Sequence, residues 1–169
     1  MRKITLITGG QRSGKSSYAQ KLAEEACEKP VYLATARYWD EDFTERIRRH
    51  QSDRGEQWET VEEDTYLSKL NITGRTVLLD CITLWLTNLF HDSNYNPEKA
   101  LELAKQEWDQ FVQNENHLLV VSNEIGMGIH GGAEISRKFT DIHGWMNQHI
   151  AEQADEVILM VSGIPMKIK

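Results

Sequence analysis

This sequence has few cysteines, no long apolar run and no excess of positive charge. Its two cysteines, Cys27 and Cys81, have neither zinc-site nor C-x-x-C spacing, and Cys81 lies in an apolar run where a buried thiol is expected. The run Ile4–Ile7 is too short for a signal peptide or a membrane span, because two glycines soon interrupt it. We therefore expect a cytoplasmic protein in a reducing compartment, without a membrane span.

The formal net charge of -7 argues against a nucleic-acid binder, since such proteins gather Lys and Arg to contact phosphates. Small anionic ligands held by local donors remain compatible with that charge. The hydrophobic fraction of 40% is ordinary, and no internal repeat, low-complexity tract or long linker appears. A chain of 169 residues with these properties predicts one globular domain over residues 1–169.

Short apolar or β-branched runs alternate with segments of helical periodicity along the chain. We predict strands at Lys3–Thr8, Pro30–Thr35, Thr76–Asp80, His117–Ser122 and Glu156–Ser162, and helices at Ser16–Cys27, Asp40–Gln51, Ile82–Phe90, Pro97–Gln113 and Ala133–Gln153. The tail after Gly163 suits an edge strand, because Pro165 is disfavoured in a central one. This alternation predicts an α/β fold with a mostly parallel sheet, helices on both faces and ligands at the carboxyl ends of the strands.

The last predicted helix carries an apolar stripe at three- and four-residue steps. Its members are Ile135, Phe139, Ile142, Met146 and Ile150. Such a stripe covers one side of a helix, and we predict that all five residues belong to the core.

A phosphate-binding loop follows the first predicted strand. Positions 9–16 satisfy G-x-x-x-x-G-K-[ST] between a strand and a helix, which is the context that the motif requires. The members are Gly9, Gly10, Gln11, Arg12, Ser13, Gly14, Lys15 and Ser16. The glycines let backbone N–H groups converge on phosphate oxygens, and Lys15 is expected to meet the β- and γ-phosphates. The motif predicts a three-layer P-loop NTPase of the RecA-like kind that binds a purine nucleoside triphosphate.

A magnesium site is predicted beside this loop. Ser16 offers a hydroxyl ligand, and Asp80 ends a predicted strand as the carboxylate expected to hold the hydration shell of Mg²⁺. The loop alone identifies triphosphate binding and leaves the reaction open. An Asn-Lys-x-Asp motif is absent, and Arg137 is the only arginine after Arg75. Switch GTPases and nucleoside monophosphate kinases with an arginine-rich lid are therefore disfavoured.

A second cluster of basic residues includes a histidine. Arg46, His50 and Arg54 are spaced four apart in a segment that is acidic at its start and basic at its end, which suits a helix. Neighbouring guanidinium groups favour the neutral, nucleophilic imidazole near pH 7, and the same groups can hold phosphate. Two other interpretations stay open from spacing alone: a solvated helix end, or a partly buried histidine beside Phe43 and Ile47.

Several strings follow one another in a fixed order along the chain. After the phosphate-binding loop come YLATA at 32–36, RIRRH at 46–50 with Arg54 and Trp58, DCITLWLTN at 80–88, SNEIGMGI at 122–129, and NQ at 147–148 with ADE at 154–156. Read together, they resemble the bifunctional adenosylcobinamide kinase/adenosylcobinamide-phosphate guanylyltransferase family nearly from end to end. The resemblance implies phosphorylation of adenosylcobinamide by ATP or GTP. It then implies transfer of GMP from GTP, through a histidine, to adenosylcobinamide phosphate.

By this resemblance His50 matches the histidine that carries GMP, and Arg49 and Arg54 are suited to offset charge on the transferred phosphorus. The positions carried over as nucleotide or metal contacts are the loop Gly9–Ser16, Ala34, Thr35, Ala36, Gln51, Ser52, Asp53, Arg54, Glu62 and Asp80. Glu62 suits the N–H groups of guanine, although a surface carboxylate is an equally ordinary role. The family also implies a homotrimer, whereas Trp85, Trp108 and Trp145 are each expected to be buried on helix faces within one subunit.

Two loops depart from the family pattern. His130, Gly131 and Gly132 replace the usual Val-Pro after Ile129, and Gly55 replaces a common proline. These changes loosen loops, one of them near the expected corrinoid site, and so bear on substrate handling more than on nucleotide binding. Two other functions stay open: a small-molecule kinase without guanylyl transfer, and a nucleotide-gated binding module.

Overall fold

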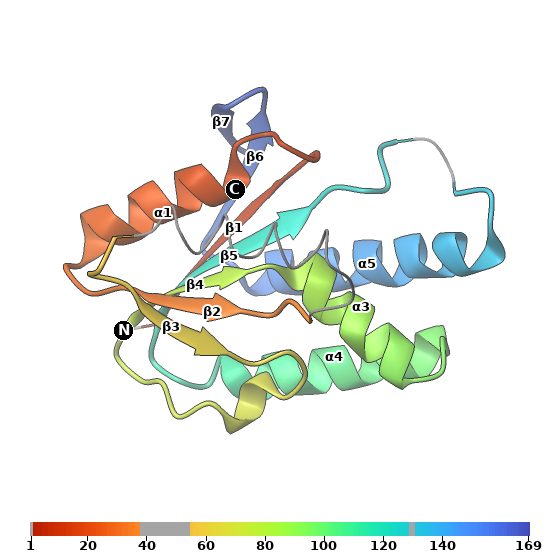
Figure 1. The fold of residues 1–169 in the computed structure, drawn as a ribbon. Helices are drawn as coiled ribbons and strands as arrows, with labels where there is room; N and C mark the ends of the chain where they lie inside the picture. Colours follow the sequence, from red (N-terminus) through yellow and green to blue (C-terminus); the bar gives the residue numbers. More distant parts are fainter. Residues whose placement is uncertain (1, 38–54, 129–130) are drawn as a thin grey trace.

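The computed structural model describes residues 2–37, 55–128 and 131–169. A seven-stranded sheet forms its centre, in the order β3-β2-β4-β5-β1-β6-β7 (Figure 1). The strands are β1 Lys3–Gly9, β2 Val31–Ala34, β3 Glu59–Glu62, β4 Thr76–Asp80, β5 His117–Asn123, β6 Glu156–Val161 and β7 Ile164–Lys167. Neighbouring strands are parallel except β6 and β7, which are antiparallel. The predicted α/β fold with a mostly parallel sheet is thus confirmed.

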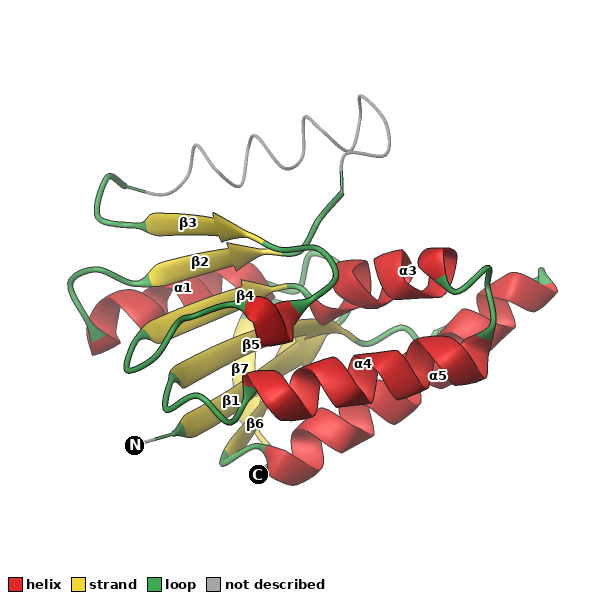
Figure 2. Cartoon of the chain, turned by 90° about the horizontal axis from the view of Figure 1, so that it is seen from below, coloured by secondary structure: helices red, strands yellow, loops and turns green. Residues whose placement is uncertain are grey.

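Helices cover both faces of the sheet (Figure 2). α1 Lys15–Ala26 lies on one face, α3 Ile82–Asp92, α4 Pro97–Phe111 and α5 Glu134–Gln153 lie on the other, and the short 3-10 helix η1 Leu67–Lys69 packs beside α4. Asn96 caps the amino-terminal end of α4, because its side chain accepts a hydrogen bond from the Lys99 N–H. Pro97 is the first residue of the helix, where a missing N–H costs nothing. Three layers result, and in the described ranges no helix is long and apolar enough to cross a membrane.

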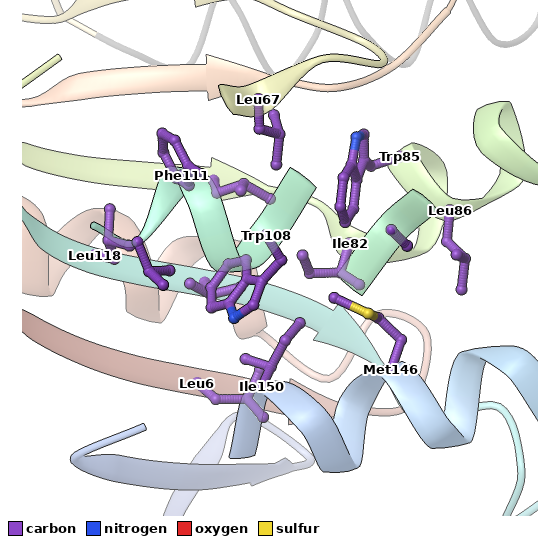
Figure 3. Close-up of a cluster of buried hydrophobic side chains, with 14 of the residues drawn as sticks. Leu6, Leu67, Ile82, Trp85, Leu86, Trp108, Phe111, Leu118, Met146 and Ile150 are labelled. Atoms are coloured by element: carbon purple, nitrogen blue, oxygen red, sulfur yellow. The ribbon is translucent and has the colours of Figure 1, made fainter. Parts of the chain in front are cut away.

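The larger core lies between the sheet and the three helices α3, α4 and α5 (Figure 3). Trp85 of α3 and Trp108 and Phe111 of α4 are fully buried there, together with Met146 of α5. Burying one such side chain contributes about 1.5–3 kcal/mol. The predicted burial of Trp85 and Trp108 is confirmed, whereas Trp145 is 52% exposed and its predicted burial is wrong.

The apolar stripe of α5 is only partly core. Ile142, Met146 and Ile150 are buried and Phe139 packs partly buried against the same cluster, but Ile135 is 42% exposed. The amino-terminal end of α5 extends beyond the carboxyl ends of the strands (Figure 1). No strand covers the first turn of the helix for that reason, and the predicted core position at Ile135 is wrong.

Candidate active site

The phosphate-binding loop connects the end of β1 to the start of α1. Gly9, Arg12 and Gly14 have positive φ values of 152°, 56° and 94°. A Cβ at Gly9 would stand 2.5 Å from the Met160 carbonyl oxygen and 2.8 Å from Ser13 Oγ, so only glycine fits there. The backbone therefore curls as the motif predicts, at the amino-terminal end of a helix whose first N–H groups suit an anion.

Backbone hydrogen bonds from two neighbouring elements hold this loop. The Gly163 N–H, in the turn between β6 and β7, donates to the Ser13 carbonyl at 2.9 Å. The Glu124 N–H, just after β5, donates to the Gly9 carbonyl at 2.8 Å. The loop is thus fixed by a hairpin and a strand end that lie far from it in the sequence.

Lys15 is directed into the loop. The residue is only 7% exposed. Its Nζ donates a hydrogen bond to the Gly10 carbonyl at 2.6 Å and lies 3.5 Å from Ser13 Oγ. Burial lowers the pKa of Lys15, and the negative charge of nearby Asp80 opposes that shift. A phosphate would offer this ammonium a stronger, charge-assisted partner than a carbonyl oxygen does.

Asp80 and Asn123 end neighbouring strands on the side of the sheet that carries α1. Leu78 and Val121 lie in the core under α1, so the residues two positions further along each strand face the same side. In register, Asn123 pairs with Gly9 and Asp80 pairs with Val121. A carboxylate and an amide are therefore placed along the edge of the sheet where the phosphate-binding loop begins.

Ser16 and Asp80 carry side-chain oxygens of the hard kind that Mg²⁺ prefers, and their role as metal ligands stays a prediction. Tyr32 Oη donates to Asp80 Oδ2 at 3.3 Å, which orients the carboxylate. Among the residues described, no three His, Cys, Asp or Glu side chains are grouped as a metal site. The donor set fits an ion that takes its remaining ligands from phosphate oxygens and water, as magnesium does in nucleotide sites.

A polar cavity of about 260 Å³ lies at the carboxyl ends of β2 and β3. Three predicted contacts, Ala34, Ala36 and Glu62, line it together with Arg37 and Asp64. Ala34 and Glu62 are direct neighbours in the register of the two strands. Small side chains on one wall and a carboxylate on the other suit a flat ligand with N–H donors.

Arg37 in this cavity is already neutralised by two carboxylates. Its Nε lies 2.7 Å from Asp64 Oδ2, and its Nη2 lies 2.7 Å from Asp92 Oδ2. The guanidinium lowers the pKa of Asp92 to about 2 and also lowers the pKa of Asp64, so both stay ionised at neutral pH. The positive charge of Arg37 is therefore already balanced, which disfavours phosphate binding in this cavity.

The Thr35 side chain ties β2 to the turn after β4. Thr35 is buried, and its hydroxyl donates to the Cys81 carbonyl at 2.8 Å while accepting from the Cys81 N–H at 2.9 Å. Cys81 is buried as expected, and burial raises the pKa of its thiol to about 12. Both side chains thus serve the architecture of the strand ends.

A buried polar network fixes the backbone of Asn123 from the α5 side. Thr83 Oγ1 accepts from the Asn123 N–H at 3.1 Å, and Asn147 Nδ2 donates to the Asn123 carbonyl at 3.2 Å. His143 is 1% exposed, and its Nε2 lies 2.9 Å from Thr83 Oγ1. The network sets where the Asn123 amide stands beside the phosphate-binding loop.

Burial lowers the pKa of His143 to about 4 from an ordinary value of 6.5. The unfolded chain takes up this proton near the ordinary pKa and the folded chain only near the lowered one, so the free energy of unfolding falls as pH drops between them. The gap from 6.5 to 4 is worth at most about 3 kcal/mol. Urea unfolding across this pH range should show that fall in the wild type and less of it in His143→Gln. The same pH dependence in both proteins would contradict the assignment.

The predicted site residues fall into two groups, those that the structure describes and those that lie outside the described residues. Gly10, Gln11 and Arg12 are exposed on the phosphate-binding loop, where a ligand can reach them. His50 lies outside the described residues, as do Arg49, Gln51, Ser52, Asp53 and Arg54. Their roles stay predictions.

Sequence comparisons relate nearly the whole chain to known proteins. A family model described as cobinamide kinase / cobinamide phosphate guanyltransferase matches residues 5–168. The bifunctional adenosylcobalamin biosynthesis protein CobP of Pseudomonas aeruginosa is 37% identical over 168 residues, which cover 97% of this chain and 96% of that protein. The bifunctional adenosylcobalamin biosynthesis protein CobU of Escherichia coli is 38% identical over 187 residues, covering 98% of this chain and 99% of its relative.

Structural comparisons relate the fold to two solved proteins of low sequence identity. The flagellar accessory protein FlaH of Methanocaldococcus jannaschii aligns with a TM-score of 0.50 and 12% identity, over 99% of this chain and 78% of that one. An ATPase from the type III secretion system of pathogenic bacteria aligns with a TM-score of 0.54 and 11% identity, over 93% of this chain and 50% of that one. At such low identity these likenesses establish the fold alone, and the fold is of the predicted RecA-like P-loop kind.

Proposed function

The chain belongs to the cobinamide kinase / cobinamide phosphate guanyltransferase family, and we propose that it phosphorylates adenosylcobinamide and then guanylylates the product. ATP or GTP is the phosphate donor of the first reaction, and GTP supplies GMP in the second. The observation that carries this proposal is the extent of the match, since residues 5–168 include the phosphate-binding loop, Asp80 and the cavity residues. We further propose that residues 1–169 act as one domain.

In the kinase step, the terminal hydroxyl of adenosylcobinamide attacks the γ-phosphorus. The new P–O bond forms as the bond to the β-phosphate oxygen breaks, the nucleoside diphosphate leaves and the hydroxyl proton passes to water. Lys15 and the N–H groups of the loop hold the phosphates and stabilise the charge that develops. Ser16 and Asp80 would hold Mg²⁺, which would supply further neutralisation of the phosphate oxygens.

In the transfer step, an imidazole nitrogen of His50 attacks the α-phosphorus of GTP. A P–N bond forms, the bond between the α-phosphorus and the bridging oxygen breaks, and pyrophosphate leaves. A phosphate oxygen of adenosylcobinamide phosphate then attacks the same phosphorus, which breaks the P–N bond and restores the histidine. Covalent catalysis divides one displacement into two easier ones.

We assign the nucleobase to the polar cavity at the ends of β2 and β3. Ala34 and Ala36 leave room for a flat ring, and Glu62 is suited to accept from the N–H groups of guanine. The proposed contacts of Gln51, Ser52, Asp53 and Arg54 follow from the family resemblance. Arg37 stays with its two carboxylates and so contributes shape and not phosphate binding.

We also propose a cytoplasmic homotrimer. The β6–β7 hairpin exposes a row of apolar side chains that a second subunit could cover: Val161, Ile164, Met166 and Ile168. Trp145 on α5 is exposed as well and is a further candidate for subunit contact. Both cysteines are free thiols, which suits a reducing compartment.

The test is formation of a covalent enzyme adduct. Wild-type protein incubated with Mg²⁺ and GTP should gain the mass of one GMP in intact-protein mass spectrometry, and peptide mapping should place it on His50. The bond should be labile in acid and stable in base, as a phosphoramidate is. Addition of adenosylcobinamide phosphate should discharge the adduct. If the protein phosphorylates the corrinoid but forms no adduct, the proposed guanylyl transfer through His50 is wrong and only the kinase activity remains.

A further inference from the structure

An apolar pocket of about 520 Å³ lies between α3 and the amino-terminal end of α5. Phe90 and His91 of α3, Ile125 of the loop after β5, and Ile135 and Phe139 of α5 contribute to its wall. Both helices extend beyond the carboxyl ends of the strands at this point (Figures 1 and 2). The volume falls within the range of about 300–1,000 Å³ that small-molecule sites occupy.

The wall of this pocket is aromatic and already packed. The ring centroids of Phe90 and Phe139 are 5.9 Å apart, and those of Phe90 and Tyr95 are 5.5 Å apart in an edge-to-face arrangement. Tyr95 and Ile135 are 48% and 42% exposed, so apolar surface remains open at the rim. A flat ligand with apolar faces can cover that surface without displacing a core side chain.

Two threonine hydroxyl groups of the pocket donate hydrogen bonds within their own helices. Thr87 Oγ1 donates to the Thr83 carbonyl at 2.8 Å, and Thr140 Oγ1 donates to the Ser136 carbonyl at 2.9 Å. Neither threonine therefore needs a ligand atom to accept its hydrogen bond. Most of the remaining wall is apolar, so the pocket suits recognition by shape and apolar contact more than the polar cavity at the ends of β2 and β3 does.

The pocket begins one residue away from the phosphate-binding loop. Glu124 donates its N–H to the Gly9 carbonyl at 2.8 Å, and the next residue, Ile125, lines the pocket. Because Glu124 is hydrogen-bonded to the loop and Ile125 follows it directly, the wall of the pocket at Ile125 adjoins the loop that is expected to hold the phosphates. Thr87, Phe90 and His91 on the other wall belong to α3, the helix that follows Asp80 in the chain.

We propose that this pocket receives one edge of the corrin macrocycle of the acceptor, an inference that rests on the proposed function. A corrin ring has broad apolar faces and is larger than the pocket, so the remainder of the ring lies over the exposed rim at Tyr95 and Ile135. The arm that ends in the hydroxyl, and later in the phosphate, reaches past Ile125 toward Gly9. Donor and acceptor then approach the reacting phosphorus from opposite sides of the β4 strand end.

A carboxylate placed at Ile135 tests this assignment. The residue is exposed in the first turn of α5, where an acidic side chain is tolerated by the helix dipole, so Ile135→Glu should fold normally. Burying that charge against the macrocycle costs desolvation energy, so KM for adenosylcobinamide should rise and its binding should weaken by about tenfold or more. Binding is measured by equilibrium dialysis with detection of the visible absorbance of the corrinoid. Formation of the GMP adduct from GTP alone should keep its wild-type rate.

Two matched variants separate location from charge. Gln148→Glu adds the same charge at an exposed position of the same helix, outside the pocket, and should leave the corrinoid KM unchanged. Ile135→Leu keeps the apolar contact and should behave like wild type. An unchanged corrinoid KM in Ile135→Glu overturns the proposal. A change in oligomeric state, seen by light scattering, without a change in corrinoid KM overturns it as well. Failure of adduct formation in the wild type would instead count against the proposed function.

Discussion

Replacing Lys15 with alanine is expected to lower kcat/KM by about 10²-fold or more for both the phosphorylation of adenosylcobinamide and the transfer of GMP. Lys15 Nζ lies 2.6 Å from the Gly10 carbonyl, inside a loop that leaves the residue 7% exposed. A charge held out of water interacts with phosphate more strongly than a surface charge does. Both reactions use the same triphosphate grip, so one substitution should impair both. Initial rates with each acceptor measure the effect.

Lys21→Ala is the matched control for this prediction. Lys21 lies on the same helix with its side chain 71% exposed, and its 3.8 Å ion pair with Glu25 is of the exposed kind that contributes little. Both rates should stay close to wild type in this variant. Lys15→Arg should not restore activity, because a planar guanidinium does not fit the position of a compact ammonium. Full activity in Lys15→Ala would contradict the placement of Lys15 at the phosphates.

The phosphate-binding loop could be predicted from sequence because contiguous residues build it. Its glycines and Lys15 follow one another in the chain between a predicted strand and a predicted helix, whereas the hydrogen bonds from Glu124 and Gly163 that hold the loop come from distant segments. Ala34, Ala36 and Glu62 were carried over from the family resemblance as nucleotide contacts; they line one cavity, and their contact with nucleotide stays a prediction. Glu62 nevertheless ends a strand, β3 Glu59–Glu62, that was not predicted. Its side chains are exposed or half-buried and two of the four are charged, so no apolar run marks it.

Asn123 received no role from the sequence, although it stands next to Gly9 in the sheet. A polar residue after an apolar run looks like an ordinary strand end. What makes it significant is that β5 lies between β4 and β1, and strand order depends on packing between distant segments. The edge strand β7 was easier to anticipate, because Pro165 excludes a central position.

Replacing His50 with alanine should separate the two reactions of the enzyme. The variant should form no GMP adduct and should lose guanylyl transfer by about 10³-fold or more, because it lacks the proposed nucleophile. Phosphorylation of adenosylcobinamide should change little, since the acceptor hydroxyl is the nucleophile in that step. Both rates are measured on one protein preparation, with adenosylcobinamide phosphate supplied separately for the transfer reaction. The ratio of the transfer rate to the kinase rate, compared with wild type, shows whether the substitution affects transfer alone.

A histidine of structural importance would give a different pattern. Loss of packing would impair both reactions together, because both depend on the same loop and the same triphosphate. His149→Ala shows what such a loss looks like: His149 Nε2 lies 2.8 Å from Asp109 Oδ1 between α4 and α5, remote in sequence from the phosphate-binding loop. Any effect of that variant should fall on the two rates equally. Parallel losses in His50→Ala would therefore remove the covalent step from the mechanism while leaving Lys15 and the kinase reaction in place.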